Sequence, residues 1–160
     1  MISVSLNGNI NILNRNSPDA PERTIQAHQV SITALHFDRT TSKLYTGSFD
    51  GVICTYDFTA AAALGGVNNK TKTIECIRLV GTDKRHISGG VHAGKVSGIC
   101  TIDDSVISVG WDDKMRLGSQ ASRSFSEETG LSGQPCHLAS CASTTNLVLV
   151  ITTAEVSISL

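Results

Sequence analysis

Short stretches in which apolar and polar residues alternate run along the whole chain. They are clearest at residues 2–6, 30–34 and 156–160, and turn residues such as Asn, Asp, Gly and Thr lie between strands. Alternation with a period of two places successive side chains on opposite faces of a β-strand. The pattern therefore predicts an all-β fold of short antiparallel strands joined by tight turns.

The strand pattern repeats along the chain. Residues 26–35 align with residues 90–99, and both stretches place a His directly before an alternating strand. Further along, residues 43–57 align with residues 105–117. This recurrence indicates two copies of one supersecondary unit, of the kind that stacks against its neighbours to bury a shared core.

Two partial copies flank the full ones. Residues 2–14 overlay the second half of the unit, with Asn7 and Gly8 in the places of Asp50 and Gly51. We expect the end of a unit with two strands at 1–14, a repeat at 15–60, an insertion or loop at 61–84, a repeat at 85–118, a loop and outer strand at 119–135, and a partial unit at 136–160.

The spacing of the repeats predicts the insertion. The interval from His28 to His92 is longer than the next one by roughly 20 residues, whereas repeats of this type run to about 40–45 residues. We place the excess within residues 61–84, which contain an Ala run and several Gly and Asn. The outer strand of that repeat lies either at 73–80 or at 85–89, and the pattern leaves both open.

Each full unit carries the residue types of a WD repeat, which forms one four-stranded blade of a β-propeller. In such a repeat a His, a Ser or Thr, an Asp and an aromatic residue form a buried hydrogen-bonded network. The predicted members are His28, Thr46 or Ser48, Asp50 and Tyr56 in one repeat, and His92, Ser108 and Asp112 in the other. Gly118 stands at the aromatic position of the second repeat, so we expect its network to be truncated.

The pattern favours a structural role for these residues, in a hydrogen-bonded network, over a catalytic role. A neighbouring His, Ser and Asp suggest a hydrolase, but here they recur with the repeat. Residues 89–95 imitate a phosphate loop, yet Val96 replaces the hydroxyl residue that binds magnesium and a strand follows instead of a helix. We therefore expect no catalytic residue, no cofactor and no enzyme.

The five cysteines form no Cys-x-x-Cys pair. We expect most of them to be reduced and to fill the interior of sheets. Cys136, His137 and Cys141 are three possible zinc ligands, but a fourth ligand and a partner motif are missing. No metal site is predicted.

Composition narrows the class of partner. The formal net charge of -1 provides no attraction for nucleic acid or an anionic membrane surface. No apolar run approaches the roughly 18 residues that span a bilayer, and the first residues lack the features of a signal peptide. We expect a cytoplasmic protein that binds other proteins rather than nucleic acid, membrane or a small-molecule substrate.

Phe49 and Trp111 occupy equivalent positions, each directly before the Asp of a turn. Because that Asp points inward to its His, the aromatic side chain should point the other way. The two residues predict either a partner-binding patch at one rim of the propeller or packing in the groove between adjacent blades. The second is the commoner arrangement for large aromatic residues.

Beyond the general repeat, four stretches resemble the actin-interacting protein 1 family: residues 2–11, 23–35, 44–54 and 109–116. That family has two seven-bladed propellers, and the segment resembles the start of the second. The resemblance implies binding to actin and to cofilin-decorated filaments, promotion of filament disassembly, and a place at the cytoskeleton. It assigns no actin-contact residue at these positions.

The alternative is a WD-repeat scaffold or adaptor of another cytosolic complex, one that serves a ubiquitin ligase or a signalling assembly. The fold alone does not separate the two functions. A second propeller elsewhere in the protein would favour the actin function, whereas an F-box or RING domain would favour the adaptor.

Overall fold

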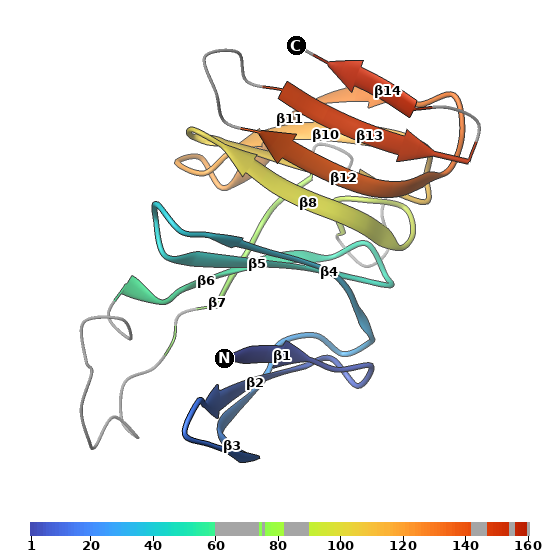
Figure 1. Ribbon diagram of the computed structural model, residues 1–160. Helices are drawn as coiled ribbons and strands as arrows, with labels where there is room; N and C mark the ends of the chain where they lie inside the picture. The colour runs from blue at the N-terminus through green and yellow to red at the C-terminus, as the bar shows by residue number, and fades with distance from the viewer. Residues whose placement is uncertain (60–73, 75, 82–89, 142–146, 154–155, 160) are drawn as a thin grey trace.

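The strands form four antiparallel sheets that follow one another along the chain. The computed structural model describes residues 1–59, 74, 76–81, 90–141, 147–153 and 156–159, and for residues 18 and 156–159 the backbone alone. Figure 1 shows the sheets stacked one on another in chain order. None of the described segments forms a helix long and apolar enough to cross a membrane.

Each sheet is built from strands that are consecutive in the chain. The first contains β1 (Ile2–Val4), β2 (Asn9–Asn14) and β3 (Ser17–Gln26). The second contains β4 (Ile32–Asp38), β5 (Lys43–Ser48), β6 (Ile53–Asp57) and β7 (Cys76–Arg78). The third contains β8 (Val96–Ile102), β9 (Ser105–Gly110), β10 (Lys114–Ser119) and β11 (Ser124–Gly130). The fourth contains β12 (Pro135–Cys141), β13 (Leu147–Thr152) and β14 (Val156–Ser159).

Apolar side chains fill the spaces between neighbouring sheets. Between the first and second lie Ile10, Ile32, Leu44, Val52, Cys54, Tyr56 and Phe58. Between the second and third lie Ala34, Tyr45, Ile53, Leu79, Val91, Val96, Ile99, Val106 and Phe125. Between the third and fourth lie Cys100, Ile102, Ile107, Val109, Leu138, Val148 and Val150. The two middle sheets are thus covered on both faces.

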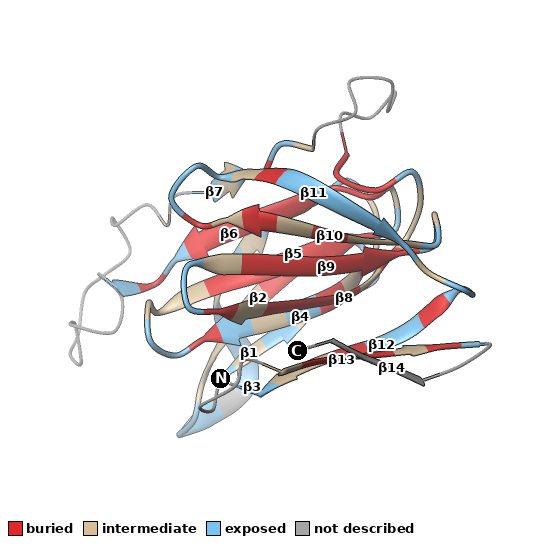
Figure 2. Cartoon of the chain, turned by 90° about the horizontal axis from the view of Figure 1, so that it is seen from above, coloured by how far each residue is buried: buried red, intermediate tan, exposed pale blue. Residues whose placement is uncertain are grey.

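This double cover explains why the central strands lose the alternation of exposed and buried residues. Every residue of β5 after Lys43 is buried, and every residue of β9 after Ser105 is buried. A strand with sheets on both faces hides both sets of its side chains. Figure 2 shows this burial along β5 and β9, whereas β3 and much of β11 are exposed.

The turns after β1, β5 and β9 have the same geometry. Gly8, Gly51 and Asp113 take positive φ values of 82°, 82° and 55°. Their backbone N–H groups donate to the carbonyl oxygens of Ser5, Ser48 and Gly110 at 3.1, 3.2 and 3.2 Å. The three turns therefore place their intervening residues equivalently.

Two of these turns also hold the loop that leads to the next sheet. The carbonyl oxygens of Gly8 and Gly51 accept hydrogen bonds from the N–H groups of His28 and His92 at 3.0 and 3.2 Å. A Cβ atom at Gly51 would lie 1.9 Å from the His92 carbonyl oxygen. Glycine is required there both by its φ value and by this close approach.

The sequence repeat and the sheet are out of phase by one strand. β3 lies near the start of the repeat expected at 15–60, yet it pairs with β2 of the sheet before. β7 falls in the first of the two stretches considered for an outer strand, 73–80, and it pairs with β6. Most of the predicted insertion at 61–84 and all of the alternative strand at 85–89 lie outside the described residues.

The segment after β7 ties the second sheet to the third. The N–H of Val80 donates to the carbonyl oxygen of Arg123 at 3.1 Å, and the N–H of Phe125 donates to Val80 at 3.0 Å. The N–H of Leu79 donates to Ile53 at 2.9 Å. This segment therefore bonds to both sheets at their outer edge.

Candidate functional site

The predicted network of the second sheet gathers where β5 leads into its turn. His28 Nε2 lies 2.7 Å from Thr46 Oγ1. The Ser48 hydroxyl donates to the Asp50 carboxylate. The Tyr56 hydroxyl donates at 3.3 Å to the backbone carbonyl that precedes His28. Thr46 is thus the hydroxyl residue that contacts the His, and Ser48 is the one that contacts the Asp.

His28 is neutral near pH 7. Burial lowers the pKa of its imidazole, and the nearby Asp50 carboxylate offsets only part of that effect. A neutral imidazole has one donor and one acceptor nitrogen, which suits a hydrogen bond to the Thr46 hydroxyl. The second-sheet network therefore holds one buried neutral ring against the Thr46 hydroxyl.

The third sheet has a His and an Asp at the equivalent positions, in direct contact. His92 Nδ1 lies 2.8 Å from Asp112 Oδ1, and His92 Nε2 lies 2.8 Å from Ser108 Oγ. The N–H of Ala93 donates to Asp112 Oδ2 at 3.1 Å. His92 has no exposed surface, at 0%. The structure thus brings together all three residues predicted for this repeat.

Arg116, on β10, is a member of this network that sequence reasoning missed. Its side chain is 2% exposed. Its Nη1 lies 2.6 Å from Asp112 Oδ2 and 2.7 Å from His92 Nδ1, and its Nη2 lies 3.3 Å from Glu128 Oε2. A guanidinium group and an ionised carboxylate make short, charge-assisted hydrogen bonds. The third-sheet network is therefore an ion cluster rather than a neutral one.

Asp112 stays ionised within this cluster. Burial on its own raises the pKa of a carboxyl group. Here the hydrogen bond and charge of His92, together with hydrogen bonds from Arg116 and the Ala93 amide, outweigh burial and hold the pKa of Asp112 well below its ordinary 3.8. The carboxylate thus balances the charge of the buried guanidinium.

The aromatic position of the third sheet is filled from a different strand. A Cβ atom at Gly118 would lie 2.6 Å from the Ser124 carbonyl oxygen and 3.0 Å from Phe125 Cδ1. Phe125, on β11, is 2% exposed and packs in the space between the second and third sheets. The third-sheet network has no aromatic member at Gly118, but Arg116 adds polar contacts to it and Phe125 adds aromatic bulk beside it.

The His residues of both networks and the hydroxyl residues that contact them are buried. His28, Thr46, His92 and Ser108 are 6%, 0%, 0% and 0% exposed. A nucleophile or general base must reach its substrate to act. Within the described part of the chain, no group of three or more His, Cys, Asp or Glu side chains is placed to hold a metal ion. These contacts serve to hold loops against sheets.

The cysteines divide between core and surface. Cys54 and Cys100 are buried, whereas Cys76, Cys136 and Cys141 are exposed. The expectation that most cysteines fill sheet interiors is therefore wrong. Burial raises the pKa of the Cys54 thiol to about 12, so this side chain remains a thiol.

Phe49 and Trp111 meet at the surface. Their ring centroids lie 6.3 Å apart with an interplanar angle of 64°, an edge-to-face contact. Phe49 is 54% exposed and Trp111 is 44% exposed. Lys95 Nζ lies 4.6 Å from the centroid of the Trp111 ring. The structure thus brings these two predicted residues together, half in solvent rather than between sheets.

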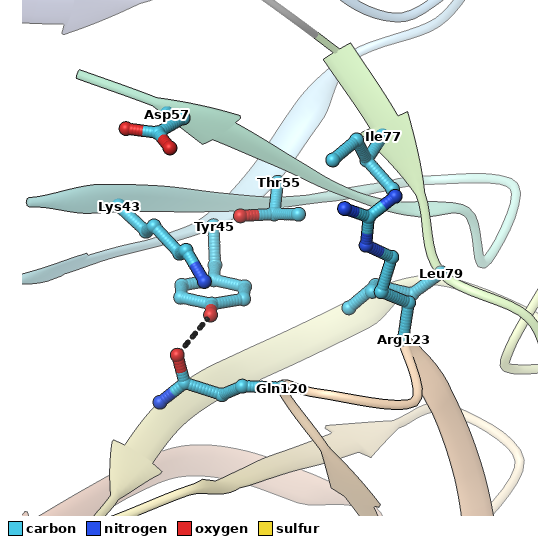
Figure 3. Close-up of a pocket in the computed structure, with 8 residues that line it drawn as sticks. All are labelled: Lys43, Tyr45, Thr55, Asp57, Ile77, Leu79, Gln120 and Arg123. Carbon is cyan, nitrogen blue, oxygen red and sulfur yellow. Dashed lines mark hydrogen bonds between the residues drawn. The ribbon is translucent and has the colours of Figure 1, made fainter. Parts of the chain in front are cut away.

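A cavity of about 100 Å³ lies at the other end of the second and third sheets. Figure 3 shows the residues around it: Lys43, Tyr45, Thr55, Asp57, Ile77, Leu79, Gln120 and Arg123. The Tyr45 hydroxyl donates to Gln120 Oε1 at 2.9 Å, and Gln120 Nε2 donates to the Asp103 carbonyl oxygen at 2.9 Å. Burial raises the pKa of Tyr45 to about 12, so its hydroxyl keeps the proton it donates. The bonds here join two sheets.

The corresponding groove between the third and fourth sheets has a different lining. It is formed by Ile107, Met115, Leu117, Glu127, Thr129 and Val148. Ile107 and Leu117 take the places that Tyr45 and Thr55 occupy one repeat earlier. Such grooves therefore arise from the stacking of sheets, and their lining changes from one repeat to the next.

Four antiparallel sheets stacked in chain order, two of which carry a buried His, hydroxyl and Asp network, define a segment of a WD-repeat β-propeller. The solved WD40 β-propeller domain of Doa1 superposes with a TM-score of 0.71 at 17% identity, covering 98% of this chain and 45% of that chain. The computationally designed Ika4 protein gives 0.69 at 16% identity, covering 98% of this chain and 82% of that chain. At these identities the likeness shows the fold alone.

The sequence relatives are more specific, and they confirm the resemblance to actin-interacting protein 1. The chain is 31% identical over 127 residues to actin-interacting protein 1 of Drosophila melanogaster, covering 79% of this chain and 17% of that protein. It is 32% identical over 130 residues to WD repeat-containing protein 1-B of Xenopus laevis, covering 79% and 18%. It is 39% identical over 64 residues to the 66 kDa stress protein of Physarum polycephalum, covering 40% and 11%.

No family model matches the chain. The chain spans less than a fifth of the length of these relatives, 17% and 18% of the two that match most of it. The chain is therefore a WD-repeat protein that its relatives link to actin.

Proposed function

We propose that this chain is part of a non-catalytic WD-repeat protein that binds actin and cofilin-decorated filaments and promotes filament disassembly at the cytoskeleton in the cytoplasm. The observation that carries the proposal is the identity of 31% over 79% of the chain to a protein named for its interaction with actin. Cofilin and disassembly extend that observation through the resemblance of four sequence stretches to the family.

The geometry supports a binding role rather than catalysis. WD40 propellers and relatives of this kind are typically scaffolds, and their functions lie in surface sites on a common fold. In this chain the His and Asp groups of both networks lie inside hydrogen-bonded contacts, while two large aromatic side chains stand half in solvent. Exposed aromatic residues are the type that dominates interface energetics.

Co-sedimentation with the full-length protein that contains this segment tests the proposal. Actin filaments are pelleted with the protein, with and without bound cofilin, and filament length is followed in parallel. We expect the protein to pellet with the decorated filaments and to speed their shortening. Failure to pellet with either kind of filament would contradict the proposal.

A further inference from the structure

The exposed aromatic pair belongs to a row that spans three sheets. Leu6, Phe49 and Trp111 are each the first residue of the equivalent turns that end in Gly8, Gly51 and Asp113. They are 82%, 54% and 44% exposed, which places them among the most exposed large apolar side chains of the described residues. Leu6 was not among the residues predicted from the sequence.

Hydrogen bonds through Ser31 and one ring contact connect the members of this row. The Ser31 hydroxyl donates to the Leu6 carbonyl oxygen at 2.8 Å, and the Phe49 N–H donates to the Ser31 carbonyl oxygen at 3.0 Å. The Phe49 and Trp111 rings touch, and the Trp111 N–H donates to the Lys95 carbonyl oxygen at 2.9 Å. The backbone below the row is therefore fixed, so the three side chains stand in a constant order.

The fold does not produce such a row automatically. In the fourth sheet the N–H of Thr153 donates to the Gln134 carbonyl oxygen at 2.9 Å. This bond is equivalent to the one from the Trp111 N–H to the Lys95 carbonyl oxygen in the third sheet. Thr153 is exposed and polar at this equivalent position. Contiguous exposed apolar groups are uncommon on a soluble surface and mark interaction sites. The row thus ends at Trp111 by residue choice rather than by geometry.

The charged group in contact with the aromatic pair favours one kind of occupant. The Asp50 and Asp112 carboxylates turn inward, to Ser48 and to His92 with Arg116 respectively. The charged group that lies on the aromatic pair is the Lys95 ammonium, over the Trp111 ring. A cation on an apolar ridge is complementary to a carboxylate flanked by apolar side chains.

We infer that Leu6, Phe49 and Trp111, which we call the apolar ridge, dock an acidic segment of the cofilin-decorated actin filament, with Lys95 pairing to a carboxylate of that segment. This inference rests on the proposed function and deepens it by assigning the contact surface. Trp111 and Phe49 are the anchors, since aromatic residues contribute most to such contacts and Leu contributes less.

Alanine variants of the anchors test the ridge in the full-length protein. We expect Trp111→Ala to weaken binding to cofilin-decorated filaments about 30-fold or more and Phe49→Ala to weaken it similarly, with a smaller effect for Leu6→Ala. Phe37→Ala is the matched control, because Phe37 is 42% exposed but lies at the opposite end of β4. It should bind as the parent protein does.

Charge reversal at Lys95 tests the same surface without removing an aromatic ring. We expect Lys95→Glu to weaken binding and to reduce its dependence on salt concentration, because an attractive pair becomes repulsive. Lys95→Arg keeps the charge and should retain binding. If Trp111→Ala also lowers the stability of the protein, the two Lys95 variants decide the question.

The outcomes separate the ridge from the proposed function. A parent protein that pellets with decorated filaments, together with Trp111→Ala, Phe49→Ala and Lys95→Glu variants that pellet equally well, overturns the ridge and leaves the function standing. A parent protein that binds no filament overturns the function and the assigned occupant together. Loss of binding in the ridge variants, with Phe37→Ala unaffected, supports both.

Discussion

The second and third sheets solve one structural problem in two ways. Each must fix the loop before its inner strand, and each uses a buried His, a hydroxyl residue and an Asp in the next turn. The second sheet completes the contact with Tyr56, whose hydroxyl bonds to the loop backbone. The third sheet completes it with the buried cation of Arg116.

The difference shows what the repeat fixes and what it leaves open. The repeat fixes where the His and the Asp stand, because both lie at loop ends whose backbone bonds recur from sheet to sheet. The repeat does not fix which residue of the third strand faces the His and the Asp, since Cys54 and Arg116 occupy the same place in the two repeats. The second-sheet network, which has no buried cation among its described residues, and the third-sheet network, which contains Arg116, should therefore respond differently to the same substitution.

The largest expected effect is that of Asp112→Ala. This change leaves the Arg116 guanidinium, which is 2% exposed, without its main counter-charge. Removing one partner of a buried ion pair costs about 3–5 kcal/mol, because the other charge remains buried and uncompensated. Urea unfolding of the full-length protein, read as the free energy of unfolding of the domain that contains the segment, measures the loss.

A double variant serves as the control for this prediction. Asp112→Ala combined with Arg116→Met removes both charges and keeps an apolar side chain of similar length, so much of the lost stability should return. A cost below about 1 kcal/mol for Asp112→Ala alone would mean that water reaches Arg116 and that the third-sheet network is not a buried ion cluster.

The contrast between the two networks also marks the limit of sequence reasoning. The all-β fold, the WD-repeat class and the places of His28, His92, Asp50 and Asp112 follow from local alternation and from the repeat. Arg116 was missed because a lone Arg on an alternating strand resembles a solvent-facing charge. Its burial depends on His92 and Asp112, which reach it from other segments.

Two other failures have the same origin. Gly118 predicted an empty aromatic position, but Phe125 fills that space from a neighbouring strand. Most of the five cysteines were expected inside sheets, yet Cys76, Cys136 and Cys141 are exposed. The pairing of neighbouring strands and the packing of the outer surface decide these cases, and the repeat pattern carries no information about them.

The second prediction compares the turns of the two sheets. Gly51→Ala forces a Cβ atom into a positive-φ position and toward the His92 carbonyl oxygen, 1.9 Å away. We expect a loss of about 2–4 kcal/mol from backbone strain and overpacking together. Asp113→Gly at the equivalent position of the third sheet is the control and should change stability by less than about 0.5 kcal/mol. Equal effects at the two positions would show that the His92 carbonyl yields freely.

The third prediction is Asp50→Ala in the second sheet. The change removes the carboxylate that the Ser48 hydroxyl donates to and that lies near the His28 ring. A lost partner in a partly buried hydrogen-bonded network costs about 1–3 kcal/mol, less than the loss of the counter-charge of a buried guanidinium. Denaturant unfolding of Asp50→Ala beside Asp112→Ala measures both. A larger cost at Asp50 than at Asp112 would reverse the comparison between the sheets.

The smallest expected effect is a difference in how the two networks respond to pH. The pKa of His28 is lowered from its ordinary 6.5 by burial, so the unfolded chain binds a proton more readily and the stability from this site falls as pH drops below about 6.5. The pKa of Asp112 is lowered from its ordinary 3.8, so its contribution is complete above about pH 4 and is lost only as pH falls further.

Two differences in the free energy of unfolding, each measured between pH 7 and 5, test this expectation. The first is that of the parent protein minus that of His28→Gln, and the second is that of the parent protein minus that of Asp112→Asn. The first difference should shrink and the second should stay constant. His36→Gln is the control for histidine in general, because burial also lowers the pKa of His36 but its ring bonds to Thr101 rather than to the network. A second difference that shrinks over the same range would show that the contribution of Asp112 is lost above pH 5 and that the two networks respond to pH alike.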